Sequence, residues 1–328
     1  MSVLWCGGED IDFGNGNAAT VGVGAGSFRS TFARCAIAVP TSGNTETSNQ
    51  FPGGAVTSAW LACRYNSSGP GTNAYLFGAG LFGTNSGLFI GVDSTTATKL
   101  ALKKYDGTTL TQLASESGTS LPLTLARLDM QIVSYGVSAT VNIYVNSGLV
   151  ITFTGDVTVS GMTNFNCVAL GRSNGNNFIS EVMVATDDLR AWPGLATMAL
   201  TGAGTTNNWT NNTFSNINGT SFSDSNPTYT NVNATLQEYN ITDLPAGTFN
   251  IGAVKIVARA TESLGAAVSK VELGYNSGGS VAYGAGATKT MTLAYASYEQ
   301  LDITNPVTSA TWVQSDMNGL QLDIQALT

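Results

Sequence analysis

The stretch ATVNIYVNSGLVITFT, residues 139–154, decides the fold that the sequence predicts. Apolar and polar side chains alternate over residues 140–145, which is the two-residue period of a strand with one buried face. Asn146-Ser147-Gly148 interrupts the pattern, and a second strand-like run follows at residues 149–154. We therefore expect two antiparallel strands joined by a three-residue loop, with Gly148 in the left-handed conformation.

Similar runs recur along the chain, bounded by Gly, Asn or Ser. Helical periodicity is nearly absent: a short amphipathic helix is expected in residues 315–327, with Met317, Leu320 and Ile324 inward, and a single turn in residues 187–192. The sequence therefore predicts an all-β, antiparallel β-sandwich protein. The expected strands with the clearest pattern are Ser27–Val39, Thr57–Tyr65, Gly87–Val92, Lys99–Tyr105 and Leu123–Ser134.

A change in composition indicates two domains, which suits a length of 328 residues. Pro193-Gly194 breaks the strand pattern, and no Lys or Arg occurs between Arg190 and Lys255. Aromatic residues such as Trp209 recur in the Asn/Thr/Ser-rich stretch after the break, so short strands and loops are expected there rather than disorder. The expected division is a first domain at 1–192, a linker at 193–204 and a second, smaller β-sandwich domain at 205–328.

Composition excludes several classes of function. Histidine is absent, which excludes Ser-His-Asp and Cys-His catalysis and His-based metal sites. With 13 Lys+Arg against 21 Asp+Glu the formal net charge is −8, so we expect neither nucleic-acid binding nor docking on an anionic membrane. Apolar runs are too short to cross a bilayer, and the N-terminal residues do not form a secretory signal. We therefore expect synthesis in the cytoplasm without a leader.

The four cysteines, Cys6, Cys35, Cys63 and Cys167, lie in apolar, strand-like surroundings and form no CxxC motif. Buried free thiols that pack as small apolar side chains are expected. Disulfides are the alternative, and they would require an oxidising compartment.

No motif predicts an enzyme. Residues 78–83 match GxGxxG, but a strand rather than a helix follows, so the match predicts a glycine-rich turn. Two carboxylates would suffice for glycoside hydrolysis, yet Glu181 stands alone in its expected strand, and Asp187-Asp188 reads as a cap or a solvated turn. No catalytic residue, metal ligand or cofactor is expected. A glycan-cleaving enzyme stays as a third hypothesis, and it would depend on Glu181 and Asp188.

Tryptophans are the remaining candidates for a binding role. Trp60 lies in an alternating strand, so packing in the core is expected. Trp192 and Trp209 flank the domain boundary, where packing between domains or subunits is the simplest role and a polyol-binding groove is the alternative. The candidate binding residues are therefore Asp187, Asp188, Trp192 and Trp209.

Several segments resemble known folds. The hairpin at 139–155, FISEVMVA at 178–185 and SVLWCGGEDIDF at 2–13 resemble the central, last and first strands of laminin-G-like, concanavalin-type jelly rolls. With a second β domain that opens at 195–209, the arrangement resembles virion proteins of tailed bacteriophages. The second domain supports this through Leu244-Pro245-Ala246-Gly247 before 251–260 and through its ending at 312–327. The resemblance implies that the last strand of the jelly roll returns beside the first.

The resemblance also implies a non-enzymatic structural protein on the exterior of a tailed-phage virion, as a head decoration or as a tail or fibre component. It would act through self-association, with a trimer as the simplest state, and through docking on other virion proteins. The alternative is a carbohydrate-binding host-attachment module, for which the Asn- and Thr-rich loops around Trp209 are the reason. Its partners would be host surface glycans. The expected location is the virion, without nucleic-acid contact or membrane insertion.

Overall fold

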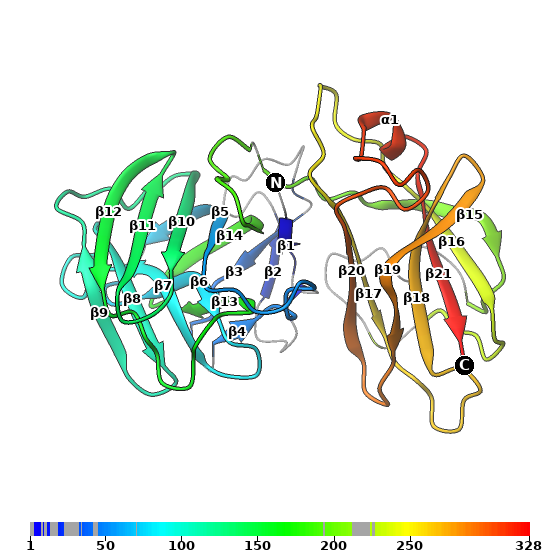
Figure 1. Cartoon of the computed structure of the whole chain (residues 1–328), viewed down its shortest axis with the longest axis horizontal. Coiled ribbons are helices and arrows are strands. Elements are labelled where there is room, and N and C mark those ends of the chain that lie inside the picture. The colour runs from blue at the N-terminus through cyan, green and yellow to red at the C-terminus, as the bar shows by residue number, and fades with distance from the viewer. Residues whose placement is uncertain are drawn as a thin grey trace. The chain divides into compact units, whose positions relative to one another are not determined.

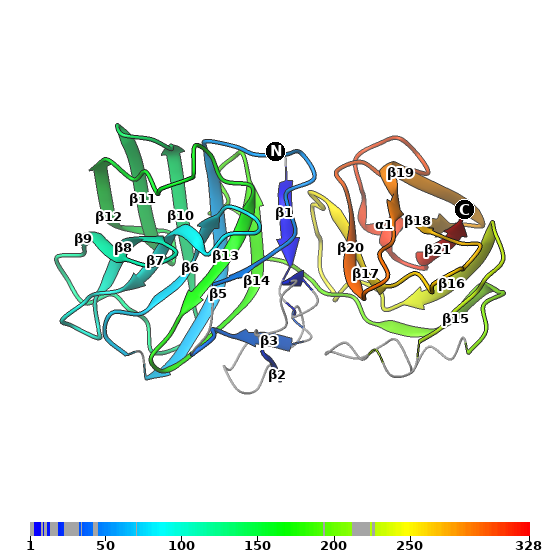
Figure 2. The same cartoon turned by 90° about the horizontal axis from the view of Figure 1, so that it is seen from below.

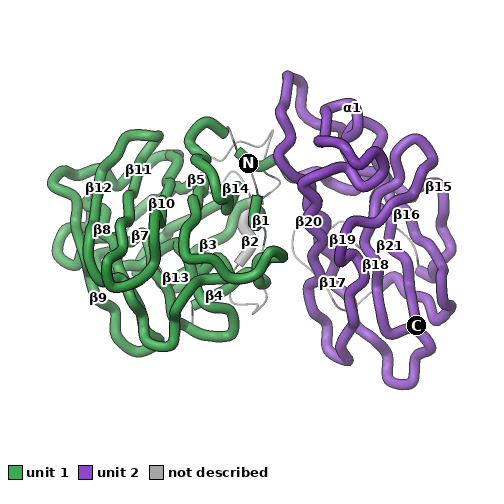
Figure 3. Tube along the Cα trace, in the orientation of Figure 1, with its two compact units in different colours: residues 1–195 green, residues 196–328 purple. Residues whose placement is uncertain are grey.

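The chain forms two compact units, Met1–Leu195 and Ala196–Thr328, in the computed structural model (Figure 3). The residues that the structure describes are 3–7, 9, 12–13, 19–22, 33, 35–41, 45–69, 71–192, 194–211, 224 and 227–328, with the backbone alone for 19–22 and 35. Nearly all regular structure in these residues is antiparallel strand, which confirms the all-β sandwich prediction. Residues 200–204 of the expected linker are the first part of a strand of the second unit.

Two sheets face each other in the first unit (Figures 1 and 2). One has the order β12-β11-β10-β5-β14-β3-β2, with β1 also paired to β14, and the other has the order β4-β13-β6-β7-β8-β9. The strands of the first sheet are β1 (Val3–Gly7), β2 (Ala19–Gly22), β3 (Cys35–Ala38), β5 (Ala59–Gly69), β10 (Ala126–Ser134), β11 (Ala139–Val145), β12 (Gly148–Gly155) and β14 (Asn176–Ala185). Those of the second are β4 (Glu46–Thr47), β6 (Tyr75–Gly80), β7 (Ser86–Val92), β8 (Leu100–Asp106), β9 (Leu110–Ser115) and β13 (Cys167–Arg172). The pairing of β1 with β14 is the one that the resemblance implies.

The core of the first unit lies between these sheets. Leu61 and Met130 from one sheet and Leu88 and Leu102 from the other are fully buried in one apolar cluster. Because side chains alternate along a strand, every second residue of β8 points away from this core, toward the outer face of the six-stranded sheet. That outer face includes Lys103 and the residues of β8 that lie two positions from it on either side.

The opening hairpin is present, but its turn differs from the prediction. Asn146 and Ser147 have φ of 47° and 71°, and Gly148 already pairs with Val145 as the first residue of β12. Two left-handed residues make a two-residue turn of the kind whose twist matches that of the strands. The expected three-residue loop with a left-handed Gly148 is therefore wrong. The expected strand Ser27–Val39 is described only from residue 33 on and there contains β3.

The second unit contains a five-stranded sheet with the order β15-β16-β21-β18-β19 and a two-stranded sheet, β17-β20, among the residues described. Its core joins Leu273 and Tyr275 to Trp312, whose indole N–H donates to the Asp302 carbonyl at 2.9 Å. The elements are β15 (Leu200–Asn207), β16 (Thr235–Ile241), β17 (Val254–Ala260), β18 (Lys270–Ser277), β19 (Ser280–Thr290), β20 (Ala296–Asp302), α1 (Gln314–Met317) and β21 (Gln321–Leu327). Much of the stretch 212–226, with its two aromatic residues Phe214 and Phe222, lies outside the described residues.

The short amphipathic turn expected within residues 315–327 is present only at its start, although Met317, Leu320 and Ile324 face the core as expected. Helix α1 ends at Met317, and β21 then pairs with β16 on one side and β18 on the other. Leu322 and Ile324 pack against the core while the residue between them points to the opposite face. The segment is therefore a strand because it pairs with another strand on each side, although its apolar spacing also fits a helical turn. The single turn expected in 187–192 is a hydrogen-bonded turn, in which the Trp192 N–H donates to the Leu189 carbonyl at 2.9 Å.

Candidate functional site

The segment after β14, residues 186–192, carries three of the four predicted site residues. In it, the Asp188 carboxylate is ion-paired with Arg190 at 2.6 Å between Oδ2 and Nη2 and accepts the Arg190 N–H at 2.9 Å. The hydrogen bonds from the Arg190 side chain hold the pKa of Asp188 below its ordinary value. The same guanidinium lies over the rings of Trp60 and Tyr144, at 5.0 and 4.5 Å from their centroids. Asp188 thus orients an arginine that covers two aromatic rings.

Trp60 is buried, but on the face opposite to the one expected. Leu61 and Cys63 point into the core between the sheets, and Trp60 alternates with them. Its ring stacks on Tyr144 at 5.5 Å and 25°, and Arg190 covers the pair. The expectation of core packing for Trp60 is therefore wrong about the face, because a side chain outside the sandwich can also be buried.

Arg127 of β10 joins residues 186–192 to the sheet through hydrogen bonds. Its side chain is buried, with Nε 2.8 Å from Oδ1 of Asp129, and its guanidinium donates to the carbonyls of Leu189 and Trp192. Trp192 therefore contributes a main-chain acceptor to a buried ion pair. These contacts give the segment a structural role, and a ligand-binding role for it stays a prediction.

The other two predicted residues also make local contacts. Asp187 accepts the Thr186 hydroxyl at 3.3 Å. Trp209 belongs to the second unit, where its indole N–H donates to the Thr235 carbonyl and its main-chain N–H to the Gln237 side chain, both at 3.2 Å. The ring is partly exposed. Its role in binding is likewise still a prediction.

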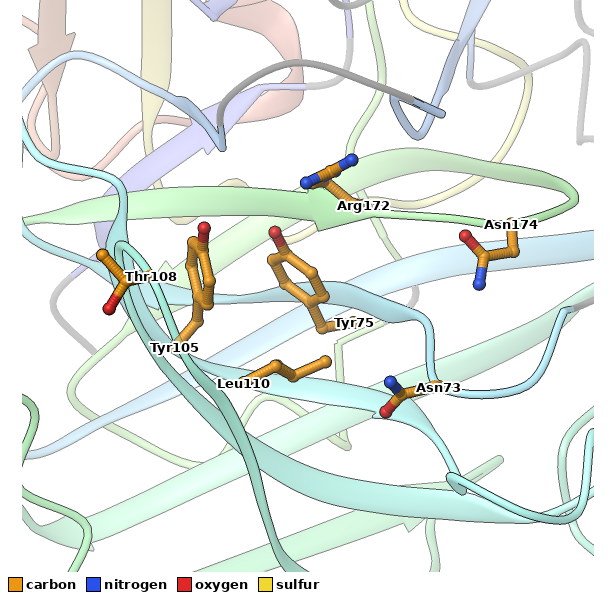
Figure 4. A pocket seen from close by; sticks show the side chains of 7 residues that line it. All are labelled: Asn73, Tyr75, Tyr105, Thr108, Leu110, Arg172 and Asn174. Atoms are coloured by element: carbon orange, nitrogen blue, oxygen red, sulfur yellow. The ribbon is translucent and has the colours of Figure 1, made fainter.

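A hollow of about 240 Å³ opens on the outer face of the six-stranded sheet, at residues that the sequence did not single out. We name it the Tyr75–Tyr105 hollow. Its walls come from β6, β8, β9, the end of β13 and the adjoining loops (Figure 4). The lining residues are Asn73, Tyr75, Tyr105, Thr108, Leu110, Arg172 and Asn174.

Aromatic rings form the floor of the hollow. The ring centroids of Tyr75 and Tyr105 lie 5.0 Å apart at 35°, and Tyr75 meets Phe89 edge to face at 5.1 Å. Gly171 permits this, because a Cβ there would lie 2.3 Å from the Tyr75 ring. The Tyr105 hydroxyl donates to the Gly107 carbonyl at 2.8 Å, which fixes its ring. The floor is therefore a rigid pair of tilted rings, in which Tyr75 is buried and Tyr105 is partly exposed.

Asn73 places a hydrogen-bond donor at the rim. It adopts φ of 60°, and its N–H donates to the Asp93 carbonyl at 3.0 Å, which holds the turn before β6. Buried Lys103 donates from Nζ to Oδ1 of Asn73 at 2.7 Å. Because the amide oxygen is occupied, the amide nitrogen is left to donate, and Figure 4 shows it on the side of Tyr75.

Asn174 and Arg172 complete the rim. The Asn174 amide nitrogen donates to the Thr72 carbonyl at 3.1 Å, which turns its oxygen toward Tyr75 as an acceptor (Figure 4). Arg172 is exposed, and its guanidinium lies beside the Tyr75 hydroxyl. The rim therefore offers donors on two sides and an acceptor on a third.

Burial and hydrogen bonding set the protonation of the ionisable groups in and beside the hollow. It lowers the pKa of Lys103 to about 8, against the opposing attraction of Asp93. Hydrogen bonds from Thr95 hold the pKa of Asp93 well below its usual range. Burial also raises the pKa of Tyr75 to about 12. At neutral pH Lys103 is therefore mainly a cation, and Tyr75 keeps its hydroxyl proton.

The second unit contains a pair of carboxyl groups that the sequence analysis missed. Glu238 of β16 lies directly opposite Asp323 of β21, and both are buried. Asn276 donates to Oε1 of Glu238 at 2.6 Å, and the Thr206 N–H donates to Oε2. The ring of Tyr283 lies over the glycine that faces Asp323 from β18. Alternation within single strands could not reveal this pair, because its members meet across strands.

The two carboxyl groups have opposite pKa shifts. Burial, followed by the neighbouring charge of Glu238, raises the pKa of Asp323 to about 8. Burial also opposes ionisation of Glu238, but the hydrogen bonds from Asn276 and Thr206 outweigh it and leave the pKa of Glu238 below its ordinary value. At neutral pH the pair therefore holds one proton, on Asp323, and one negative charge, on Glu238.

Other predicted features are simpler. Cys63 and Cys167 are buried free thiols whose pKa burial raises far above the usual range, Cys6 is buried, and the side chain of Cys35 lies outside the described residues. Glu181 is buried at a bulge of β14 with φ of 51°. Within the described part of the chain, no three His, Cys, Asp or Glu side chains are grouped as a metal site would require, and no helix is long and apolar enough to span a membrane.

Comparison with known proteins gives similarity of structure only. No family model matches the sequence, and no curated protein matches it. Carbohydrate-binding module CBM66 from Bacillus subtilis is 13% identical with a TM-score of 0.34, over 51% of this chain and 91% of that chain. Domain 4 of AbnA, an extracellular arabinanase from Geobacillus stearothermophilus solved with arabinotriose, is 14% identical with a TM-score of 0.34, over 59% and 83%. The globular domain of T. cruzi calreticulin is 8% identical with a TM-score of 0.36, over 57% and 89%.

Proposed function

We propose that the first unit is a carbohydrate-binding module and that the Tyr75–Tyr105 hollow is its binding site. The observation that carries the proposal is the tilted tyrosine pair with amide groups at its rim. A sugar ring offers a patch of C–H groups that packs on an aromatic face, and hydroxyls that bond to amides at its edge. The Asn73 nitrogen and the Asn174 oxygen supply one donor and one acceptor for such hydroxyls.

The volume of the hollow suits a short segment of a glycan. Its 240 Å³ is below the range of roughly 300–1,000 Å³ that holds drug-sized ligands, so one ring would fill it while the rest of the chain stays outside. None of the residues that line the hollow carries a carboxylate. Binding without hydrolysis is therefore proposed, since glycoside cleavage uses a pair of carboxyl groups.

Binding of the full-length protein to a glycan array, followed by calorimetry on the best ligand, tests the proposal. Tyr105→Ala removes half of the floor and should lower affinity at least tenfold, while Tyr105→Phe keeps the ring and should retain most of it. Tyr229→Ala is the matched control, because Tyr229 is an exposed tyrosine of the second unit. An array without any bound sugar, or equal affinities for wild type and Tyr105→Ala, would refute the proposal.

The virion role that the sequence resemblance implies is a second proposal. It concerns where the chain is assembled, and a sugar-binding unit on the outside of a particle would attach that particle to host surface glycans. Its support is the resemblance of residues 2–13, 139–155 and 178–185, together with a surface poor in charge. Mass spectrometry of purified particles tests the location, and light scattering tests the expected trimer against the 33.9 kDa monomer. Absence of the chain from the particles would overturn this second proposal.

A further inference from the structure

We propose that the sugar bound in the Tyr75–Tyr105 hollow is acidic, and that Arg172 binds its anionic group. This inference rests on the proposed carbohydrate site and names its ligand class. The shared chemistry is an oxyanion on a sugar ring, which is a carboxylate in a uronic or sialic acid and a sulfate in a sulfated sugar. Arginine presents a planar fork of N–H donors that matches both groups.

The first argument is that Arg172 differs from the other described arginines whose ion pairs are known. Arg127, Arg190 and Arg259 each pair with an aspartate, at 2.8, 2.6 and 2.7 Å. No described carboxylate lies within ion-pair distance of Arg172, and its guanidinium stands at the mouth of the hollow (Figure 4). An exposed guanidinium at a binding site, without an internal acid, is available to an anion from outside.

The second argument is the charge of the surroundings. Lys103 is a second cation beside the hollow, where it donates to the lining residue Asn73, and the buried Asp93 nearby carries the opposite charge. Asp106 is the acid next to the lining residue Thr108, and its Oδ1 accepts the N–H groups of Thr108 and Thr109 at 2.8 and 2.7 Å. That carboxylate is held in its own turn, where it stays ionised, and it is not among the residues that line the hollow. In a chain of net charge −8, the lining of the hollow carries one cationic side chain, Arg172, and no acidic one.

The third argument is geometric. The Arg172 guanidinium lies next to the Tyr75 hydroxyl, which is itself buried and keeps its proton at neutral pH, so Arg172 is the exposed donor at this end of the hollow. Asn73 and Asn174 offer a donor and an acceptor elsewhere on the lining, away from Arg172 (Figure 4). An anionic substituent of a bound sugar would therefore lie at Arg172, while its hydroxyls bond to the two amides.

Calorimetry with matched ligand pairs tests this inference on the full chain. The probes are trigalacturonate against its methyl ester, 3′-sialyllactose against lactose, and a sulfated lactose against lactose. We expect at least one acidic member to bind ten or more times tighter than its neutral partner, with a preference that falls as NaCl rises. Which acidic member shows the preference distinguishes a carboxylate from a sulfate. Arg172→Gln should reduce the acid-to-neutral ratio to about one, and Arg172→Lys should restore only part of it.

Arg259→Gln is the control, because Arg259 is paired with Asp224 in the second unit, and it should leave both affinities of each pair unchanged. Equal affinity for acidic and neutral members in the wild type would overturn the acidic-ligand inference while leaving the carbohydrate site in place. A preference that survives Arg172→Gln would also overturn it. Absence of binding to every sugar would overturn both proposals, so the two failures are distinguishable.

Discussion

Replacing Asp323 by asparagine should remove a large part of the pH dependence of the stability of the second unit. Asp323 is fully buried opposite Glu238, with neither carboxylate oxygen accepting a hydrogen bond. Its proton therefore stays on at neutral pH in the folded protein and is lost on unfolding. Asparagine has the same shape and keeps an N–H donor toward Glu238, so the substitution removes the titration while preserving the packing.

The magnitude follows from the two pKa values of Asp323, about 8 when folded and 3.8 as the ordinary value. Since the folded pKa is raised, the stabilising contribution of this group is complete below the ordinary value and is lost as pH rises toward the folded one. In between, the free energy of unfolding falls by about 1.4 kcal/mol per pH unit, or about 3 kcal/mol from pH 5 to pH 7. The pKa of Glu238 is lowered, so its contribution is already complete above its ordinary value of 4.5 and is constant in this window.

Urea unfolding of the full chain between pH 5 and pH 7.5 measures this difference. Asp323→Asn should be more stable than the wild type in the transition of the second unit, by about 1.6 kcal/mol at pH 5 and by about 4.4 kcal/mol at pH 7, so that the gap widens by about 3 kcal/mol. Asp302, whose pKa burial also raises, is present in both proteins and cancels in the comparison. Asp243→Asn replaces an exposed carboxylate of the same unit and controls for charge. Equal pH slopes in the wild type and Asp323→Asn would refute the reasoning.

Two further predictions concern the first unit. Gly171→Ala should lower sugar affinity at least tenfold, because the added Cβ would meet Tyr75 at 2.2–2.3 Å, and circular dichroism should still show the native strand spectrum; unchanged affinity would contradict this. Arg127→Met should destabilise the first unit by about 3–5 kcal/mol in urea unfolding, because it leaves Asp129 buried without its cation and frees the Trp192 carbonyl. Adding Asp129→Leu should recover much of that loss, and a double variant no more stable than the single one would count against the explanation.

The sequence predicts the local part of the fold well and the non-local part poorly. The alternation in residues 140–145 is enough to predict β11, because one face of the strand is buried and the other is not. Residues 321–327 show why the prediction fails elsewhere. Leu320 and Ile324 are four apart, which fits a helical face, but the pairing of β21 with β16 and β18 is a contact between distant segments. Spacing within the segment carries no information about those partners.

The same limit explains why the candidate site was missed. Its residues come from β6, β8, β9, the end of β13 and the adjoining loops, and no two of the rim groups Asn73, Arg172 and Asn174 form a recognised motif. The signal that was available is the parity of β8: Leu100 and Leu102 are apolar, while the residues between and after them include a lysine and a tyrosine. This alternation predicts that the lysine and the tyrosine lie on the outer face of the sheet. It does not predict which neighbouring strands contribute to the same face.

Both unusual clusters of the protein arise from one rule of strand geometry. In β8 and in β21 the inward parity supplies the apolar core, so the opposite parity is free to carry other chemistry. On β8 that parity gives a ring beside a buried lysine, and on β21 it gives a protonated carboxyl opposite an ionised one. Because the chain has few charged residues, Arg172 at the hollow has no acidic side chain on the same lining that would compete with an anionic ligand. The low content of charged residues therefore leaves Arg172 available to select the charge of a ligand.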